Sequence, residues 1–534
     1  MSSGPFQGRW SRRNVLRSAA ALGGLGALGV TAGTWAAHAQ EATWNSDVVY
    51  PGADGRLVYE TVENNSRIPD FSWAGYRNGD VPLPEVPTVA ELGPVSGDNT
   101  ERIQEALDAI GAREPDENGF RGALQLAPGE YRVGGMISIN RSGVVLRGSS
   151  QAVEGTVLLA TGPAEQFTVV RVGGSGTDEW SDAVPGTRTD ITSEFVQVGS
   201  RTFTVADPSA LSVGDNIVVY HPHTQAWTDA VEGGGAVNDP PWSPGQLPIV
   251  YNRYVKAIDG NEITICAPVF NHLDGSLTQS YVYAWDNAGI VRDCGVENLR
   301  ITMVANSAED ENHPQNCIYL TQVEDAWVRD CTLLHFSFAG VTTRTATRCT
   351  VLDTRASHPR SKLQGSRRYN FNAGPRAQQV LFKGLRASHA RHAFATSGTS
   401  LSSGCAWVDG FNDSGYSESG GHRQWSNGLL FDNIKELNNQ SNRGHVISLH
   451  NRGDQGTAHG WSSVHSVAWN CTVDNGNHVV AQRPPTAQNY AIGTTGKANG
   501  NGWAPGAVGH IEGTNKAGLE PASLYAAQLA DRLS

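Results

Sequence analysis

The segment Ala326–Phe336, AWVRDCTLLHF, decides the fold of this chain, because its pattern returns along the second half of the sequence. The related segments are VRDCGVENLRIT (291–302), ATRCTVLDT (346–354), QVLFKGLRA (379–387), CAWVDGFN (405–412), LLFDNIKEL (429–437) and HSVAWNCTV (465–473). Each joins a short β-rich run to a turn-forming residue. Their irregular spacing excludes a strict helical repeat and fits the coils of a parallel β-helix, where loops vary in length. A β-sandwich is the alternative, but its strands are usually connected by hairpins, and these segments lack regular two-residue turns.

A short amphipathic helix and a series of short strands precede these coils. In GDNTERIQEALDAI (97–110), Ile103, Leu107 and Ile110 fall on one helical face. The strands that follow are bounded by Gly, Pro or Ser, as in GALQLAPGEYRV (122–133), GVVLRGSS (143–150) and GTVLLATG (155–162). The sequence therefore predicts an all-β fold with one helix before its first coils.

The composition limits the class of partner. The chain has 534 residues, a formal net charge of −12 and 61 glycines, which is an acidic and turn-rich composition. Net acidity argues against nucleic acid as a partner. The seven cysteines are an odd number for a disulfide framework and show no metal-binding spacing, so we expect them to be small buried side chains.

The N-terminus has the features of a twin-arginine signal peptide, which we expect to span residues 1–39. Arg12 and Arg13 precede a Gly/Ala-rich apolar run that ends in Ala37-His38-Ala39, a small-residue cleavage site. The sequence therefore predicts export through the twin-arginine route to the periplasm or the extracellular space of a bacterium. No other apolar run has the length of a membrane span, so no membrane partner is expected after cleavage.

Changes in composition divide the rest of the chain into five segments. The Pro-, Gly- and aromatic-rich start indicates an extended wrap, and the turn DGN (259–261) indicates a hairpin within a separate β-rich region. We expect an N-terminal wrap at 40–95, the capping helix and first coils at 96–189, a β-rich insertion at 190–285, the main β-helix with the active-site face at 286–490, and a C-terminal tail with a helix at 491–534.

The motifs from Gly97 to Gly162 resemble the N-terminal part of pectate-lyase-superfamily proteins. This resemblance implies a right-handed parallel β-helix, capped by the helix, and a carbohydrate context. The chain also resembles a group of exported bacterial β-helix proteins, through RIPDFSWAGYRNG (67–79), RHAF (391–394), GGHRQWSNGLLFDNI (420–434) and AHGWSSVHSVAWNC (458–471). The WIDH and RxPxxR motifs of pectate lyases and the NTD, DD and GHG motifs of polygalacturonases are absent, so no catalytic residue carries over.

A basic stretch is the most informative local feature. Between Asp353 and Asp409 there is no carboxylate, but there are nine Arg or Lys and three His. Successive rungs of a β-helix stack roughly 4.8 Å apart, which is close to the length of one sugar. Dispersed positive charges can therefore meet successive uronates of an extended polysaccharide, which predicts an anionic polysaccharide as the partner. A solvated basic face is the simpler alternative.

Three segments with histidines lie in or next to the basic stretch: ARHAF (390–394), YSESGGHRQW (416–425) and HNRGDQGTAHGW (450–461). Their spacing predicts that they meet on one face. β-Elimination of a uronate needs a cation for the carboxylate, a base for the C5 proton and an acid for the leaving oxygen. Arginine can bind the carboxylate, imidazole can serve as the base, and a tyrosine can serve as the acid. The predicted catalytic residues are His422, Arg423, His392, Arg391 and Tyr416. The predicted substrate-binding residues are Lys362, Arg367, Arg368, Tyr369, Trp425, His450, Asn451, Arg452, His459 and Trp461, with the two tryptophans stacking on sugars.

Two other functions stay open at this level. Asp409, Asp413 and Glu418 follow the basic stretch and could form the carboxylate pair of a glycoside hydrolase. The same carboxylates could hold Ca²⁺, although no cofactor is certain from the sequence. A β-helix that binds polysaccharide without cleaving it is the third alternative.

Overall fold

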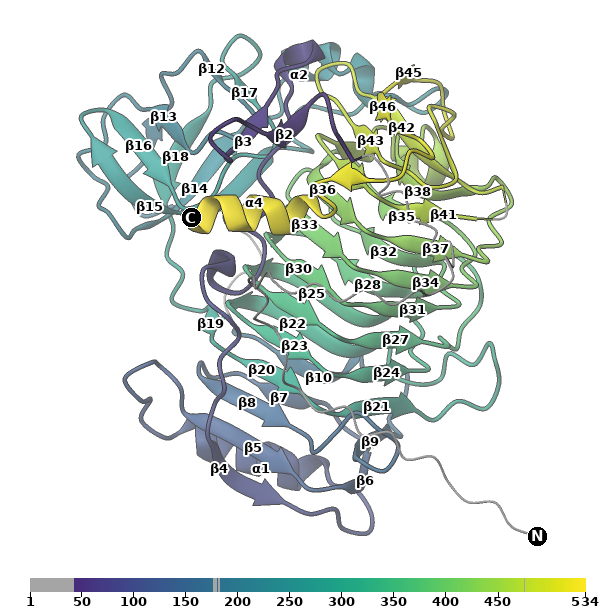
Figure 1. Ribbon diagram of the computed structural model, residues 1–534. Helices are drawn as coiled ribbons and strands as arrows, with labels where there is room; N and C mark the ends of the chain where they lie inside the picture. The colour runs from purple at the N-terminus through teal and green to yellow at the C-terminus, as the bar shows by residue number, and fades with distance from the viewer. Residues whose placement is uncertain (1–42, 176–179, 181–182, 475) are drawn as a thin grey trace, which may run out of the picture. The chain divides into compact units, whose positions relative to one another are not determined.

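The repeat found in the sequence is one coil of a solenoid, in which short parallel strands are separated by sharp corners (Figure 1). The computed structural model describes residues 43–175, 180, 183–474 and 476–534, and the predicted signal peptide lies outside them. In the coil of Ala326–Phe336, β23 (Trp327–Arg329) ends at Arg329 and β24 (Thr332–Leu334) begins three residues later. Both strands pair in parallel with the same positions of the next coil.

The coils build three sheet faces, numbered so that a full coil passes from face 1 to face 2 and then to face 3, as β22, β23 and β24 do. Face 1 contains β7 (Ile137–Ile139), β10 (Thr168–Val172), β22 (Asn316–Glu324), β25 (Ala339–Thr347), β28 (Tyr369–Ala373), β32 (His392–Thr396), β35 (Ser419–Gly421), β38 (His445–Leu449) and β42 (His478–Arg483). Face 2 contains β4 (Thr88–Leu92), β5 (Gly122–Leu126), β8 (Val144–Arg147), β20 (Gly295–Glu297), β23, β26 (Thr350–Leu352), β30 (Leu381–Lys383), β33 (Ser403–Val408), β36 (Ser426–Asp432), β40 (Val467–Trp469), β43 (Tyr490–Ile492) and β46 (His510–Glu512). Face 3 contains β6 (Gly129–Val133), β9 (Thr156–Ala160), β21 (Arg300–Met303), β24, β27 (Arg355–Ser357), β31 (Arg386–Ser388), β34 (Phe411–Asp413), β37 (Lys435–Leu437) and β41 (Thr472–Val473).

The corner between faces 2 and 3 explains the turn-forming residue of the repeat. This corner needs a left-handed backbone, which Asp, Asn and Gly adopt more readily than other residues. The residue at this corner has a positive φ in successive coils: Asn298 (56°), Asp330 (52°), Asp353 (45°), Gly384 (69°), Asp409 (54°), Asn433 (54°) and Asn470 (51°). The repeated Asp or Asn is therefore a requirement of the backbone.

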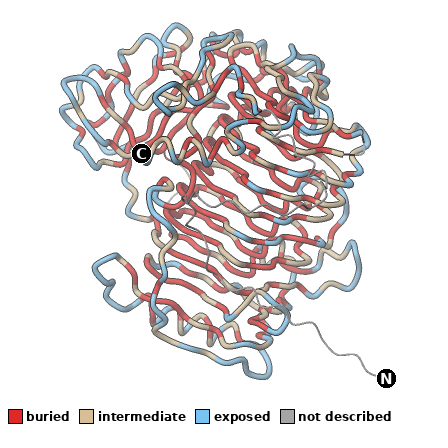
Figure 2. Tube along the Cα trace, in the orientation of Figure 1, coloured by how far each residue is buried: buried red, intermediate tan, exposed pale blue. Residues whose placement is uncertain are grey.

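Apolar side chains from all three faces fill the inside of the solenoid, where Figure 2 shows mostly buried chain. Phe382, Trp407 and Phe431 stack as a column, with ring centroids 5.2 and 5.0 Å apart and the planes within 3° of parallel. All seven cysteines lie in described residues and are buried and free. Burial raises the pKa of Cys331 and Cys349 to about 12, so these thiols are inert packing groups.

A helix covers the first coils, as the sequence predicts. In α1 (Thr100–Gly111), Ile103, Leu107 and Ile110 are buried and belong to the same core as the coils. α1 packs against β4, β5, β7 and β8. The chain is thus an all-β right-handed parallel β-helix with an N-terminal capping helix and a β-rich insertion, and the predicted fold class is confirmed.

The insertion is antiparallel, unlike the coils. Its main sheet contains β11 (Thr189–Asp190), β13 (Thr202–Thr204), β14 (Asn216–His221), β15 (Ile249–Asp259), β16 (Glu262–Ile265) and β18 (Tyr281–Ala284), beside the pair β12 (Phe195–Val196) and β17 (Leu273–Asp274) and the helix α2 (Gln225–Ala230). It docks on the corner of face 2 at Gly428, whose φ is 61°. A Cβ on Gly428 would lie 2.4 Å from the Phe270 ring, so a glycine is required for this contact.

The segment predicted as an N-terminal wrap and the C-terminal tail contact each other. β1 (Trp44–Asn45) pairs with β47 (Leu519–Glu520), and β2 (Val49–Pro51) pairs with β3 (Leu57–Tyr59). The tail helix α4 (Leu524–Leu533) holds the wrap through Gln528, whose amide accepts from Phe71 N and donates to Pro69 O. Among the described helices, none combines the length and the hydrophobicity of a membrane span.

The aromatic column gives the first testable prediction. Phe431→Ala should lower the free energy of unfolding by about 3–5 kcal/mol, because it leaves a cavity beneath Trp407. Leu363→Ala, at a side chain that is 49% exposed, should change it by less than about 0.5 kcal/mol. Denaturant unfolding followed by tryptophan fluorescence measures both variants, and equal effects would contradict the role of the column.

Candidate active site

Face 1 carries a group of polar side chains that come from successive coils. Tyr369 begins β28 and is the direct strand partner of His392, which begins β32. His422 follows β35, and Arg452 follows β38. We call this group the histidine cluster, and its members are Tyr369, Arg391, His392, Glu418, His422, Arg452 and His459.

The rings of the cluster are in contact. The ring centroids of His392 and His422 are 4.5 Å apart, and those of His422 and His459 are 5.3 Å apart. Tyr369 stacks on His392 at 5.1 Å. The three histidine segments of the sequence therefore meet at one place on face 1.

The hydrogen bonds of His422 fix its tautomer. Arg452 Nη1 lies 2.6 Å from His422 Nδ1, and because a guanidinium can only donate, Nδ1 accepts. The proton of the neutral imidazole is then on Nε2, which donates to Tyr369 Oη at 3.1 Å. Arg391 Nη1 also donates to Tyr369 Oη, at 3.2 Å. The tyrosine oxygen accepts two N–H donors, and its own hydrogen is free for another partner.

A buried ion pair holds Arg452 in this position. Arg452 Nη2 lies 3.3 Å from Glu418 Oε1, and both side chains are at most 5% exposed. Burial acts to raise the pKa of Glu418, but Arg452 and the smaller effects of neighbouring histidines and Ser417 together outweigh it, and the net result is a pKa well below the usual range. Glu418 is therefore ionised, and it balances the charge that sets the tautomer of His422.

The cluster histidines are neutral at neutral pH. Burial, followed by the positive charge of Arg452, lowers the pKa of His422 well below its usual value. Burial and Arg391 lower the pKa of His392 to about 3. Burial and Arg452 lower the pKa of His459 to about 4. A cluster of uncharged imidazoles beside two guanidinium groups favours an anionic ligand over a cation.

The cluster contains three residues of metal-binding types but does not fit a metal ion. Ligand atoms of His392, Glu418 and His422 lie within 4.8 Å of one another. Within the described residues, His392 Nε2 is buried and has no hydrogen-bond partner. Arg452 nevertheless places its positive charge between His422 and Glu418, where a cation would bind. Ca²⁺ prefers oxygen ligands, and only Glu418 among the three supplies one.

Tyr416, the predicted acid, lies outside the cluster. It lines a different pocket with His358, Arg360 and His389, and the guanidinium of Arg368 lies 6.0 Å from its ring centroid. The sequence predicts Tyr369 as a substrate-binding residue. It does not predict the hydrogen bond between the Tyr369 hydroxyl and His422. Tyr369 and His392 each begin a strand of face 1. Aligning the coils by their strand starts would therefore have placed Tyr369 beside the histidines.

The basic stretch is partly neutralised, which corrects its reading as a free positive surface. Arg367 forms an ion pair with Glu311 from another coil, with N–O distances of 2.7 and 3.0 Å. Lys362 donates its backbone N–H to the same carboxylate. Arg368 is buried and bonds to Ser361. The carboxylate that pairs with this stretch comes from outside it, so counting charges along the sequence could not reveal it.

The prediction that Trp425 and Trp461 stack on sugars does not fit their burial. Trp425 is 0% and Trp461 3% exposed. Trp425 packs edge-on against Trp227 of the insertion at 5.1 Å and donates to Asn271 at 3.0 Å. Both tryptophans therefore belong to the contact with the insertion.

Asn451 also contacts the insertion, and the adjacent His450 is buried. Asn451 Nδ2 donates to Gly235 O of the insertion at 2.8 Å. His450 is fully buried, and burial lowers its pKa to about 3. Neither side chain is open to a polymer.

The three carboxylates proposed for hydrolysis do not form a pair. Asp409 lies at the corner between faces 2 and 3, and Asp413 ends β34, four residues further along an extended chain. Asn433 Nδ2 donates to Asp409 and Asn438 Nδ2 to Asp413, so the two carboxylates have separate partners. Glu418 is buried against Arg452 on face 1. Glu418 therefore does not share a site with the other two.

Aromatic rings extend the cluster along face 1. Phe338, which precedes β25, lies 5.2 Å from Tyr369, measured between centroids. Phe167, 43% exposed, packs edge-on against Tyr319 at 5.0 Å on earlier coils. Aromatic faces of this kind stack on sugar rings, and the sequence reasoning missed them because they lie one or two coils before the basic stretch.

Comparison with known proteins finds similar chains only among solved structures. No protein-family model matches the chain, and no curated protein matches it. Among solved structures, the tailspike protein gp49 from Pseudomonas phage LKA1 is 15% identical over 75% of this chain and 64% of that chain, with a TM-score of 0.47, so the chain spans less than two thirds of the tailspike.

Two polysaccharide-degrading enzymes are similar over most of their own length. The alginate lyase from Paenibacillus is 10% identical over 80% of this chain and 100% of that chain, with a TM-score of 0.41. The polygalacturonase from Erwinia carotovora is 10% identical over 81% of this chain and 98% of that chain, with a TM-score of 0.39. The strand pairings of the chain itself give it the parallel β-helix architecture that the resemblance to the pectate-lyase superfamily implies.

The neutral histidines give a prediction on pH. A histidine that stays neutral in the folded state but titrates near pH 6.5 when unfolded stabilises the protein above pH 6.5 and loses that stability as the pH falls. For His392, the loss between pH 8 and pH 5 should be roughly 2 kcal/mol. His392→Gln should therefore lose less stability over this range than the parent, measured by denaturant unfolding at both pH values. An equal loss in the two proteins would contradict the neutral state of His392.

Proposed function

We propose that this protein is a polysaccharide lyase that cleaves a uronate-containing polysaccharide by β-elimination at the histidine cluster. The observation that carries the proposal is the hydrogen bonding of Tyr369 Oη, which accepts from His422 Nε2 and Arg391 Nη1. Two N–H donors stabilise negative charge on this oxygen when it gives up its hydrogen. Tyr369 is therefore the proton-transfer group of the cluster.

The reaction balances on this one group. In the reactive form Tyr369 Oη is a phenolate, because its hydrogen has first passed to solvent. The phenolate takes the C5 proton, and the C–H electron pair forms the C4–C5 double bond while the bond from C4 to the glycosidic oxygen breaks. The phenolic hydrogen then passes to the leaving oxygen. His422 acts as a positioning residue, because both of its ring nitrogens have protein partners. This assignment differs from the sequence-based one, in which His422 or His392 is the base and Tyr416 the acid.

Arg391 and Arg423 are the groups that bind the uronate carboxylate. Arg423 is exposed and, within the described residues, has no carboxylate partner. Arg391 is half-buried and lies over Tyr369, with its guanidinium carbon 6.0 Å from the ring centroid. Because Arg391 Nη1 donates to Tyr369 Oη, a carboxylate that binds Arg391 lies close to this oxygen. Neutralising the carboxylate also makes the C5 proton more acidic, which is what elimination requires.

The substrate follows from the surroundings of the cluster. Arginines without carboxylate partners favour an anionic polymer, and Phe338 and Tyr319 extend the site with aromatic rings. Export by the twin-arginine route would bring the enzyme to the periplasm or the extracellular space, where such polymers occur. No cofactor is needed for the proposed proton transfers.

A pair of tyrosine variants tests the proposal. Tyr369→Phe should lower kcat on a uronate polymer by at least 10²-fold, because it removes the proton-transfer oxygen and keeps the ring. Tyr416→Phe, the matched control from the other pocket, should keep kcat within about twofold. Similar rates for Tyr369→Phe and the parent would contradict the assignment.

The reaction type is tested by product analysis on a panel of uronate polymers. β-Elimination gives unsaturated ends that absorb in the far ultraviolet, together with new reducing ends. Reducing ends without that absorbance would instead indicate hydrolysis. Binding without either product would indicate a non-catalytic polysaccharide-binding protein.

A further inference from the structure

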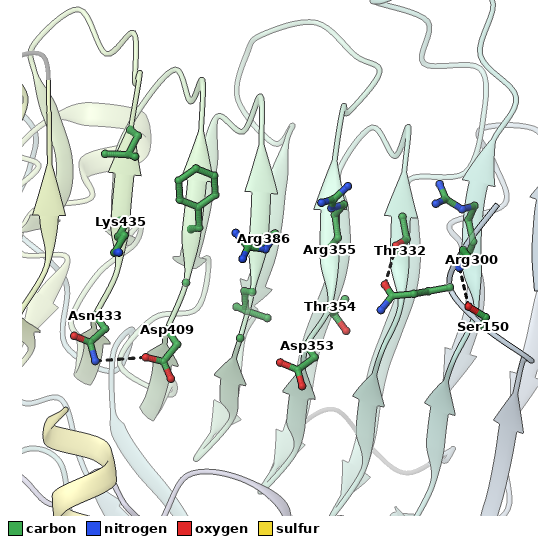
Figure 3. A pocket seen from close by; sticks show the side chains of 17 residues that line it. Ser150, Arg300, Thr332, Asp353, Thr354, Arg355, Arg386, Asp409, Asn433 and Lys435 are labelled. Carbon is green, nitrogen blue, oxygen red and sulfur yellow. Dashed lines mark hydrogen bonds between the residues drawn. The ribbon is translucent and has the colours of Figure 1, made fainter. Parts of the chain in front are cut away.

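A groove of about 1060 Å³ lies on the outer side of face 3, away from the histidine cluster of face 1. Figure 3 shows its side chains on successive coils, among them Arg300, Thr332, Arg355, Arg386 and Lys435. The residues that form its central row are Arg300, Thr332, Arg355, Arg386, Phe411 and Lys435. None of them was singled out as a binding residue by the sequence.

Strand register puts these side chains in one straight row. Arg300 pairs with Thr332, and Thr332 pairs with Arg355. Arg355 in turn pairs with Arg386. The row then continues from Arg386 to Phe411 and from Phe411 to Lys435. Adjacent members are roughly 4.8 Å apart, so the four cations lie along the solenoid axis over a length of about 24 Å.

The cations of this row are not paired. Among the described residues, no salt bridge involves Arg300, Arg355, Arg386 or Lys435, and the last three are exposed. Arg300 Nε is buried and has no hydrogen-bond partner. Burial, followed by the charge of Arg355, lowers the pKa of Arg300, while the charge of Glu154 acts in the opposite direction.

Arginines on face 2 are arranged differently. Arg147 and Arg329, from strands two coils apart, share the buried carboxylate of Glu297. In such a sheet, a carboxylate on the strand between two arginines can therefore neutralise both of them. On face 3, no carboxylate of the described residues forms a salt bridge with the row, which favours an external anion.

The edge of the groove selects among anions. Asp353 and Asp409 line one side, at the corner between faces 2 and 3, and both are exposed. Two carboxylates against four cations leave the groove positive but provide acceptors for hydroxyl groups. Phe411 offers an aromatic face between Arg386 and Lys435, and the guanidinium of Arg386 lies 5.7 Å from its ring centroid. Spaced negative charges, hydroxyls and sugar rings are the features of an anionic polysaccharide.

We propose that the face 3 groove is a second, non-catalytic binding site for an extended anionic polysaccharide, which lies along the solenoid axis across the coils from Arg300 to Lys435. The rung spacing matches the length of one sugar, so successive coils meet successive units of the chain. The choice of uronate as the anion rests on the proposed function, whereas the groove itself does not. Such a site would hold the polymer while the histidine cluster acts on another stretch.

Binding experiments on the full chain test the groove separately from catalysis. The double variant Arg355→Gln/Arg386→Gln is made in the Tyr369→Phe background, which keeps the polymer intact. Isothermal titration with polygalacturonate and with alginate, each in 50 mM and 200 mM salt, should show at least tenfold weaker binding for the double variant at low salt and a smaller salt dependence. Lys256→Gln/Lys497→Gln in the same background, which removes the same charge elsewhere, should bind like the Tyr369→Phe protein.

Other outcomes overturn the inference. Unchanged binding in Arg355→Gln/Arg386→Gln, or an equal loss in the lysine control, contradicts the groove. Stronger binding of single-stranded DNA than of the uronate polymers assigns the row to nucleic acid instead. Groove-dependent binding without turnover by the protein with intact Tyr369 supports the groove and refutes the proposed lyase. In the active protein, Arg355→Gln/Arg386→Gln should raise KM for the polymer and leave kcat within about twofold.

Discussion

The constraint on which the structure depends is the register of parallel strands, which stacks equivalent positions of successive coils roughly 4.8 Å apart. Inside the solenoid, this register turns single aromatic residues into a continuous column, as for Phe382, Trp407 and Phe431. At the corners, it aligns the Asp and Asn residues whose backbone is left-handed. On the outside, it aligns side chains that are far apart in the sequence. The proposed catalytic cluster and the face 3 groove are two results of this same alignment.

The cluster depends on one further interaction, the buried pair of Arg452 and Glu418. The guanidinium donates to His422 Nδ1 and so determines which nitrogen of His422 faces Tyr369. A divalent ion in the place of the Arg452 guanidinium could bind the His422 imidazole. It would not supply the N–H donor that Arg452 directs at His422 Nδ1 while it neutralises Glu418. Arg452 therefore links the charge of a buried carboxylate to the hydrogen bonding of the tyrosine oxygen three coils away along the chain.

The sequence predicts the fold well because the fold has a repeated physical cause. The recurring Asp or Asn and the buried residue after it, such as Cys331, are visible without coordinates. The meeting of His392 and His422 follows from coil spacing in the same way. Contacts made by the insertion are not periodic, so the burial of Trp425 and Trp461 could not be inferred. The ion pair of Arg367 with Glu311 was hidden for a similar reason, because its partner lies outside the stretch in which charges were counted.

The most direct test of the account is the protonation state of His422 in the folded protein. Nitrogen-15 NMR of selectively labelled histidine, with His422→Gln to assign the signal, reports which ring nitrogen carries the proton. The account predicts a neutral ring with its proton on Nε2 throughout pH 5.5–8. A proton on Nδ1, or a titration near pH 6.5, would contradict it, because Arg452 would then not be setting the donor that faces Tyr369.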